Sequence, residues 1–193
     1  MQTFELKGSK RTDYGKKATK ADRNGGLIPC VMYNADESLH FTTNLSELRD
    51  LVYTPKFYKV HVNVDGTQHE ALLKDIQFHP ITEQILHVDF YKLLPGVKVV
   101  TEVPIKIVGQ SQGVKEGGKL LVKVRKLKVK SLPEALKDSV EVDITPLKLG
   151  QSIKVKDLPS QGFEILNSPS IPLASIEIPR SLRSAGAKAE KSK

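Results

Sequence analysis

The sequence predicts a mainly β protein made of two β bodies and a disordered basic tail. Short apolar runs and stretches of alternating apolar and polar residues recur along the chain, as they do in strands. Turn-forming pairs such as Asp65-Gly66 separate them. From residue 180 onward Ser, Ala, Gly and Lys dominate, and these cannot build a core. We therefore expect domains at 1–93 and 97–179, followed by a tail at 180–193.

The first body is expected to hold strands joined by tight turns and one helix. Its predicted strands are residues 3–6, 28–33, 39–42, 60–64, 68–76 and 84–93. Asn44 is followed three residues later by Glu47, which is typical of a capping box and predicts a helix running to about residue 52. The apolar residues that this helix would bury are Leu45, Leu48 and Val52.

Pro95-Gly96 is the predicted boundary between the two bodies. Beyond it the predicted strands are residues 97–108, 119–130, 140–144, 152–155, 163–166 and 172–178. Within 119–130 the apolar residues change parity at Arg125-Lys126, and an extra residue at a β-bulge is the simplest cause. Pro/Gly turns between short strands favour a small sandwich or a small barrel for the second body.

Positive charge is concentrated in short zones, of which residues 7–23 are the first. They hold seven Lys/Arg against two Asp and so carry +5 of the formal +8. Hydroxyl groups and glycines lie between these cations, a pattern that suits a phosphate backbone. Membrane binding would need an apolar face, and the segment has almost none. This zone predicts a nucleic-acid-binding arm or loop, and a solvated arm without a partner is the alternative.

The other basic zones are residues 115–130, with a net charge of +6, and the tail. The lysines of 115–130 either contact RNA or protect an edge strand against aggregation, and the sequence favours neither interpretation. We expect the tail to be solubilising or weakly anchoring rather than a specific binding element.

A second candidate site comes from two strand-like pieces, residues 74–80 and 86–91. His87 and Asp89 are two residues apart and share one face of their strand, as Gln77 and His79 do on theirs. Such planar polar groups can hydrogen-bond base edges and 2′-hydroxyls and can stack on exposed bases. The alternative is a local cross-strand hydrogen bond on a solvated face.

Motifs for other kinds of chemistry are missing from the sequence. The five histidines have no metal-site spacing, and there is no phosphate-binding glycine loop or GxSxG elbow. Cys30 lies in an apolar run, where we expect a buried, inert thiol. We therefore expect no enzymatic activity, no metal or other cofactor and no small-molecule substrate. The lone cysteine suits a reducing cytosol, and no apolar run predicts secretion or membrane spanning.

Two sets of motifs carry a resemblance to a known family. The first is Arg11-(x)3-Gly15-Lys16-Lys17-Ala18-Thr19-Lys20-(x)2-Arg23, followed by Gly26-(x)-Ile28-Pro29-(x)-Val31-(x)-Tyr33. The second is Gln77-(x)-His79-Pro80 with His87-Val88-Asp89-Phe90-Tyr91. These motifs resemble the bacterial large-subunit ribosomal protein twenty-five family, in its longer two-domain form called the general stress protein Ctc. The motifs cover residues 1–93, and the chain to residue 179 is similar in length and strand order.

The resemblance implies a structural protein that binds 5S rRNA in the central protuberance of the large ribosomal subunit, in the cytoplasm. It implies an N-terminal small β barrel with helices, placed on an irregular internal loop of the RNA, and neighbouring ribosomal proteins as further partners. The RNA-binding residues that it implies in the basic zone are Lys10, Arg11, Lys16, Lys17, Thr19, Lys20 and Arg23. Those that it implies on the sheet surface are Tyr33, Gln77, His79, His87 and Asp89.

The sequence departs from the family pattern in three places. Lys20 replaces an arginine and loses its bidentate contact. Asp22 adds a negative charge that is unfavourable beside phosphate. Asn34 replaces a glycine but still tolerates the left-handed conformation.

The sequence leaves two other functions open. A basic protein-interaction or stress-adaptor module, without a specific RNA target, would bind an acidic partner protein through the cationic zones. An enzyme of RNA metabolism is the second, although the sequence supplies no catalytic groups for it. The role of the C-terminal domain is not decided.

Overall fold

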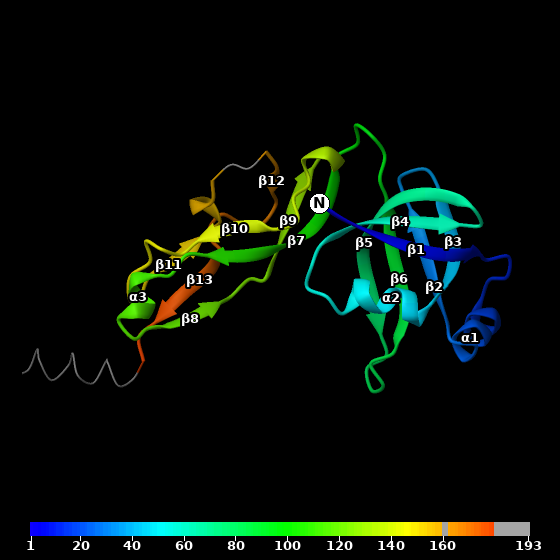
Figure 1. The fold of residues 1–193 in the computed structure, drawn as a ribbon, viewed down its shortest axis with the longest axis horizontal. Helices are drawn as coiled ribbons and strands as arrows, with labels where there is room; N and C mark the ends of the chain where they lie inside the picture. Colours follow the sequence, from blue (N-terminus) through cyan, green and yellow to red (C-terminus); the bar gives the residue numbers. More distant parts are fainter. Residues whose placement is uncertain (160–161, 180–193) are drawn as a thin grey trace, which may run out of the picture. The chain divides into compact units, whose positions relative to one another are not determined.

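The structure is a computed structural model that describes residues 1–159 and 162–179, so the predicted basic tail at 180–193 lies outside the described residues. The chain is mainly β, as the sequence predicts. It divides into two units (Figure 1). Unit 1 comprises Met1–Thr101 and Ser131–Asp138, and unit 2 comprises Glu102–Lys130 and the chain from Ser139 on.

Unit 1 is built around a closed barrel, drawn from blue to green in Figure 1. Its strands are β1 (Gln2–Lys10), β2 (Leu27–Tyr33), β3 (Ser38–Asn44), β4 (Tyr58–Val64), β5 (Thr67–Phe78) and β6 (Ile85–Lys92). They pair in the order β1-β3-β2-β6-β5-β4, and parallel pairing of β1 with β4 closes the barrel. The strands β3, β2, β6 and β5 therefore form one continuous surface, as the barrel implied by the family resemblance requires.

Alternating side chains of these strands fill the barrel, since successive residues of a strand point to opposite faces. The rings of Phe41 and Phe90 are fully buried and lie 5.8 Å apart. Gly8 of β1 passes directly over Phe41, where an added Cβ would lie 2.5 Å from the ring. Close packing at this point therefore requires glycine.

The barrel is accompanied by two helices, α1 (Lys16–Asn24) and α2 (Leu45–Val52). The predicted helix at α2 is confirmed, but of the three residues that it was expected to bury only Leu48 is fully buried. Leu48 and Leu51 are buried, whereas Leu45 is 47% exposed and Val52 is half-buried. Leu48 ends the first turn and Leu51 lies in the second, so these two residues, rather than the first residue of the helix, face the barrel core.

The start of α2 also differs from the predicted capping box. Asn44 occupies the N-cap position, but in the described part of the chain its side chain makes no capping hydrogen bond. The Glu47 carboxylate instead accepts a hydrogen bond from the backbone N–H of Lys7 at 3.0 Å. Glu47 therefore ties α2 to β1.

The chain returns to unit 1 after residue 130. Residues 131–138 include the 3-10 turn η1 (Pro133–Ala135) and bring Leu136 into a buried cluster with Leu72, Leu93 and Val99. This cluster lies outside the barrel interior, because its side chains are separate from the main core.

Unit 2 contains two open sheets. The four-stranded sheet has the order β10-β7-β9-β12, with β7 (Val99–Val108), β9 (Lys126–Ser131), β10 (Val140–Asp143) and β12 (Glu164–Ile165). The three-stranded sheet has the order β11-β13-β8, with β8 (Lys119–Val122), β11 (Ser152–Lys154) and β13 (Pro172–Glu177). The short helices are α3 (Gln112–Lys115) and η2 (Val155–Asp157). Ile107, Leu120 and Ile176 from the two sheets belong to one apolar cluster.

The predicted β-bulge at Arg125-Lys126 is wrong. β8 ends at Val122 in one sheet, and β9 begins at Lys126 in the other, so residues 119–130 form two strands. When a chain passes from one sheet to another, the alternation of buried residues can shift by one position, as it does at a bulge. The sequence pattern therefore could not distinguish a change of sheet from a bulge. β9 lies between β7 and β12, whereas β8 is at the edge of its sheet.

Candidate nucleic-acid interface

The basic zone 7–23 is not an arm or a loop, in contrast to the sequence-based expectation. Lys10 ends β1, a short connection follows, and α1 begins at Lys16. Gly15 is the N-cap residue of this helix and has a φ of 97°, a conformation that favours glycine. The zone is therefore an ordered strand end and a helix, and α1 lies beside β2 (Figure 1).

One side of α1 faces the barrel and the other faces solvent. The half-buried residues of the helix are Ala18, Thr19 and Asp22. The exposed cations of the helix are Lys16, Lys17, Lys20 and Arg23. The inner side is nearly free of large apolar side chains, so no apolar periodicity marked this helix in the sequence.

Arg11 is the centre of a hydrogen-bonded group that holds α1. Its Nη2 lies 2.8 Å from Oδ2 of Asp22 and donates to Oγ1 of Thr19 at 3.2 Å. The Thr19 hydroxyl in turn donates to the carbonyl of Gly15 at 2.9 Å. The negative charge of Asp22 is thus paired within the protein. Arg11 joins the connection after β1 to the inner side of the helix.

We expect Arg11→Ala and Asp22→Ala each to lower the free energy of unfolding by about 1–2 kcal/mol, since the pair is largely shielded from water. The Arg11 side chain is 10% exposed and that of Asp22 is 26% exposed. In the double variant the free energy of unfolding should fall by less than the sum of the two single effects, because the first substitution already abolishes the interaction between the two side chains. Urea unfolding of the four proteins measures this coupling.

The matched control is the pair Lys106 and Glu141, which lie 3.8 Å apart with side chains 65% and 62% exposed. Its coupling energy should be close to zero, because exposed ion pairs contribute little. Fully additive effects of the Arg11 and Asp22 substitutions would contradict the role of this pair in holding α1.

Arg23 fixes the other end of α1 to β6. Its Nε and Nη2 donate to the carbonyl of Leu86 at 3.1 and 2.9 Å. Leu86 directly precedes His87, so the end of the helix lies next to the second candidate site. The two sets of predicted residues therefore adjoin on the same side of the barrel.

The second candidate site lies on the outside of β3, β2, β6 and β5. Val31 of β2 pairs with His40 of β3 and with Asp89 of β6. Asp89 pairs in turn with Asp75 of β5, and Gln77 pairs with His87. We call this surface the outer polar face. It comprises Tyr33, His40, Asp75, Gln77, His87, Asp89 and Tyr91.

Two contacts order the side chains of the outer polar face. His87 Nδ1 lies 2.7 Å from Oδ1 of Asp89, and both side chains are about one quarter exposed. A neutral imidazole that donates from Nδ1 to the carboxylate presents Nε2 as an acceptor. The rings of Tyr33 and Tyr91 meet edge to face at 6.0 Å. These contacts hold four of the planar groups of the face, Tyr33, His87, Asp89 and Tyr91, in defined positions.

The Tyr33 hydroxyl is set beside negative charge. Burial raises the pKa of Tyr33, and the carboxylates of Asp89 and Asp75 raise it further. The phenol is thus kept protonated as a hydrogen-bond donor. Asp75 was not predicted as a site residue. Its position depends on a register shift between Leu73 and Asp75, which the sequence does not reveal.

His79 lies beyond the end of β5 and not beside Gln77 on the strand. Its Nδ1 accepts hydrogen bonds from the backbone N–H groups of Ile81 and Thr82 at 3.3 and 3.2 Å. The imidazole therefore organises the turn between β5 and β6. This placement corrects the expectation that Gln77 and His79 share one strand face.

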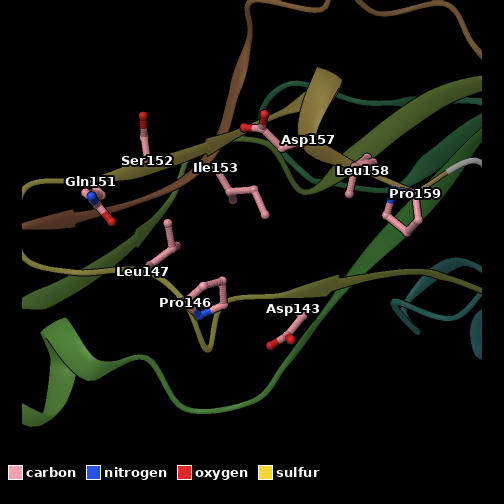
Figure 2. Close-up of a pocket in the computed structure, with 9 residues that line it drawn as sticks. All are labelled: Asp143, Pro146, Leu147, Gln151, Ser152, Ile153, Asp157, Leu158 and Pro159. Atoms are coloured by element: carbon pink, nitrogen blue, oxygen red, sulfur yellow. The ribbon is translucent and has the colours of Figure 1, made fainter.

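A pocket of about 410 Å³ lies in unit 2 (Figure 2). Its lining residues are Asp143, Pro146, Leu147, Gln151, Ser152, Ile153, Asp157, Leu158 and Pro159. The hydroxyl and backbone N–H of Thr145 hydrogen-bond to Asp143 and lower the pKa of its carboxyl group. The Asp157 carboxylate accepts from the backbone N–H of Lys154 at 2.9 Å. Both acids therefore stabilise their own loops.

Residues 1–159 and 162–179 show neither a metal-binding cluster nor a helix that could span a membrane. Within these ranges, no group of three or more His, Cys, Asp and Glu side chains is placed to hold a metal ion. No helix in the same ranges is long and apolar enough to cross a membrane. Cys30 is buried, and this burial raises the pKa of its thiol. Both observations agree with the buried, inert thiol that the sequence predicts.

The fold and the interface define a basic, mainly β protein whose closed barrel presents a cationic helix beside planar polar groups. The ribosomal L25p family matches residues 6–90, and the C-terminal domain of ribosomal protein TL5 matches residues 98–180. The large ribosomal subunit protein bL25 of Phocaeicola vulgatus is 42% identical over 198 residues, covering 99% of this chain and 100% of the relative. The bL25 proteins of Bacteroides fragilis and Cytophaga hutchinsonii are 41% and 40% identical, again over 99% of this chain and 100% of each relative.

The chain therefore belongs to the ribosomal L25p family, in the long form that carries the TL5-type C-terminal domain. The family resemblance seen in the sequence is confirmed. This is a family of structural ribosomal proteins and not of enzymes.

Proposed function

We propose that this protein is a structural component of the large ribosomal subunit of the cytoplasmic ribosome and binds 5S rRNA in the central protuberance. The observation that carries the proposal is the junction of α1 with the outer polar face through Arg23 and the Leu86 carbonyl. It places exposed cations next to groups that can recognise bases. The relatives, which are named large ribosomal subunit proteins, support the same function.

The cations of α1 supply the electrostatic part of binding. Lys16, Lys17 and Lys20 are exposed on the helix, and Lys10 is exposed at the end of β1. Their ammonium groups neutralise phosphates and release counterions. Arg11 and Arg23 position the helix with some of their N–H groups and offer the remaining ones to the backbone of the RNA. The hydroxyl of Thr19 already donates to the carbonyl of Gly15, so Thr19 contacts the RNA as an acceptor from a ribose 2′-hydroxyl.

The outer polar face supplies recognition of the RNA loop. A regular RNA helix hides its base edges in a deep major groove, whereas an irregular internal loop exposes them. Tyr33 donates a hydrogen bond, Asp89 accepts from an amino group or a 2′-hydroxyl, and Gln77 does both. His87 is held by Asp89. His79 lies in the turn at the border of the face and binds RNA there through its free ring edge.

The domain division follows the same proposal. Residues 1–93 form the RNA-binding domain, and residues 97–179 form a second β domain from which residues 131–138 return to pack on unit 1. Neighbouring ribosomal proteins are further partners. The family matches at 6–90 and 98–180 support this division. Lys128 lies 4.0 Å from Glu102, and Lys130 is in register with Glu164, so these lysines of β9 meet acidic partners within their sheet. This pairing favours a stabilising role for them over RNA contact.

A gel shift with 5S rRNA at several salt concentrations, with transfer RNA as competitor, tests the proposal. We expect saturable binding that resists competition by an equal mass of transfer RNA. Equal competition by both RNAs would contradict recognition of a specific RNA. Migration away from ribosomal particles in a sucrose gradient would favour the protein-interaction module instead.

A further inference from the structure

The turn between β5 and β6, residues 79–84, exposes an apolar side chain on an ordered backbone. Ile81 is 85% exposed, and Phe78 at the end of β5 is 44% exposed. The backbone N–H of His79 donates to the carbonyl of Gln84 at 2.8 Å, and that of Glu83 donates to the carbonyl of His79 at 2.9 Å. With the two hydrogen bonds to the His79 ring, the turn holds Ile81 in a fixed position.

The charge around this turn is opposite to that of the rest of the protein. Residues 75–91 contain no Lys or Arg, but they contain Asp75, Glu83 and Asp89. Of these three acids only Glu83 lies in the turn, so the turn itself carries −1 in a chain of +8, and Asp75 and Asp89 belong to the outer polar face. At the tip of the turn the Glu83 carboxylate repels a phosphate backbone, whereas a cationic protein surface attracts it.

We propose that this turn is a docking site for a neighbouring protein of the ribosome, with Ile81 as its central side chain. The partner surface is an apolar depression rimmed by Lys and Arg, which complements Ile81 and Phe78 in shape and Glu83 in charge. The site borders the proposed 5S rRNA interface at His79 and comprises Phe78, Ile81 and Glu83, none of which is assigned to RNA binding. Asp89 lies four residues into β6 from its start at Ile85, a distance of about 13 Å along the strand.

Ile81 is not needed for the stability of the barrel. A side chain that is 85% exposed contributes almost nothing to the core, and Ile81 does not belong to the core cluster of the barrel. A polar residue in the same turn would serve the fold equally well, because the hydrogen bonds of the turn use the backbone and His79.

Ile81→Ser in the full-length protein tests the proposal, with Leu45→Ser as the matched control. Leu45 is a 47% exposed apolar residue on α2. Both variants should keep the unfolding midpoint and the affinity for 5S rRNA of the original protein. In competition with the original protein for large subunits that lack it, Ile81→Ser should be incorporated about tenfold less, as expected for a central interface residue, and Leu45→Ser equally well.

Cross-linking from the same position identifies the partner. Ile81→Cys introduces an exposed thiol, while the buried Cys30 thiol stays unreactive in the folded protein. A benzophenone maleimide on residue 81 should cross-link, within the large subunit, to a ribosomal protein at an apolar segment flanked by Lys or Arg. Cross-links to RNA alone, or equal incorporation of both serine variants, would overturn the proposal. A loss of 5S rRNA affinity in Ile81→Ser would assign the turn to the RNA interface instead, whereas failure of the original protein to bind 5S rRNA would contradict only the proposed function.

Discussion

Asp89→Asn should lower the affinity for the irregular internal loop of 5S rRNA by roughly 10- to 100-fold and affect binding to a regular RNA duplex far less. The carboxylate accepts hydrogen bonds only, whereas the amide presents a donor on one side. Asparagine also gives up the charge that holds His87 at 2.7 Å. Two recognition groups of the outer polar face are thus changed by one isosteric substitution. Filter binding with the two RNAs under identical salt measures the difference.

The control for this prediction is Asp50→Asn, which makes the same change of charge at an exposed position on α2. It should leave the affinity for both RNAs unchanged. An equal loss of affinity for the loop and the duplex in Asp89→Asn would reduce Asp89 to a structural role. The unfolding midpoint of each variant separates such a role from direct recognition.

Replacing Lys16, Lys17 and Lys20 together by alanine should weaken 5S rRNA binding and reduce its salt dependence. Each phosphate contact contributes about 0.7 to 0.9 to the slope of log K against log salt concentration, so the slope should become shallower by about 2 to 3. The helix itself should persist, because alanine is a better helix former than lysine. Titrations at four salt concentrations give the slope.

The same number of charges is removed in the control variant, Lys126→Ala, Lys128→Ala and Lys130→Ala on β9. Its salt slope should stay close to that of the original protein, because these lysines lie on β9 of unit 2, where Lys128 and Lys130 have acidic neighbours within their sheet. Equal reductions in slope for the two triple variants would mean that net charge, and not the position of α1, determines binding.

The strands of this protein could be predicted from its sequence more fully than its helices. Alternation in β4 and the Asp65-Gly66 turn are local signals, and both positions of the turn have the expected positive φ. The helix α1 has no comparable signal, because Ala18, Thr19 and Asp22 form its inner side. Only the folded barrel supplies the surface against which such a polar helix can pack.

In the candidate site, too, local contacts could be predicted from the sequence, whereas long-range contacts could not. That His87 and Asp89 share a face follows from the period of a strand, and they are in contact. The pairing of Arg11 with Asp22 required knowledge of α1, and the place of Asp75 required the register of β5 with β6. Sequence reasoning therefore identified the composition of the interface but not the contacts that order it.

The return of residues 131–138 to unit 1 limits where the chain can be truncated to produce the barrel alone. A stop codon after residue 101 would remove Leu136 and expose its buried neighbours Leu72, Leu93 and Val99 to water. A stop codon after residue 93 would remove Val99 as well and would leave Leu72 and Leu93 exposed. The resulting fragment would tend to self-associate for a reason unrelated to its partners. A usable barrel fragment would have to carry residues 131–138 on an artificial linker, so that the truncated end is again covered.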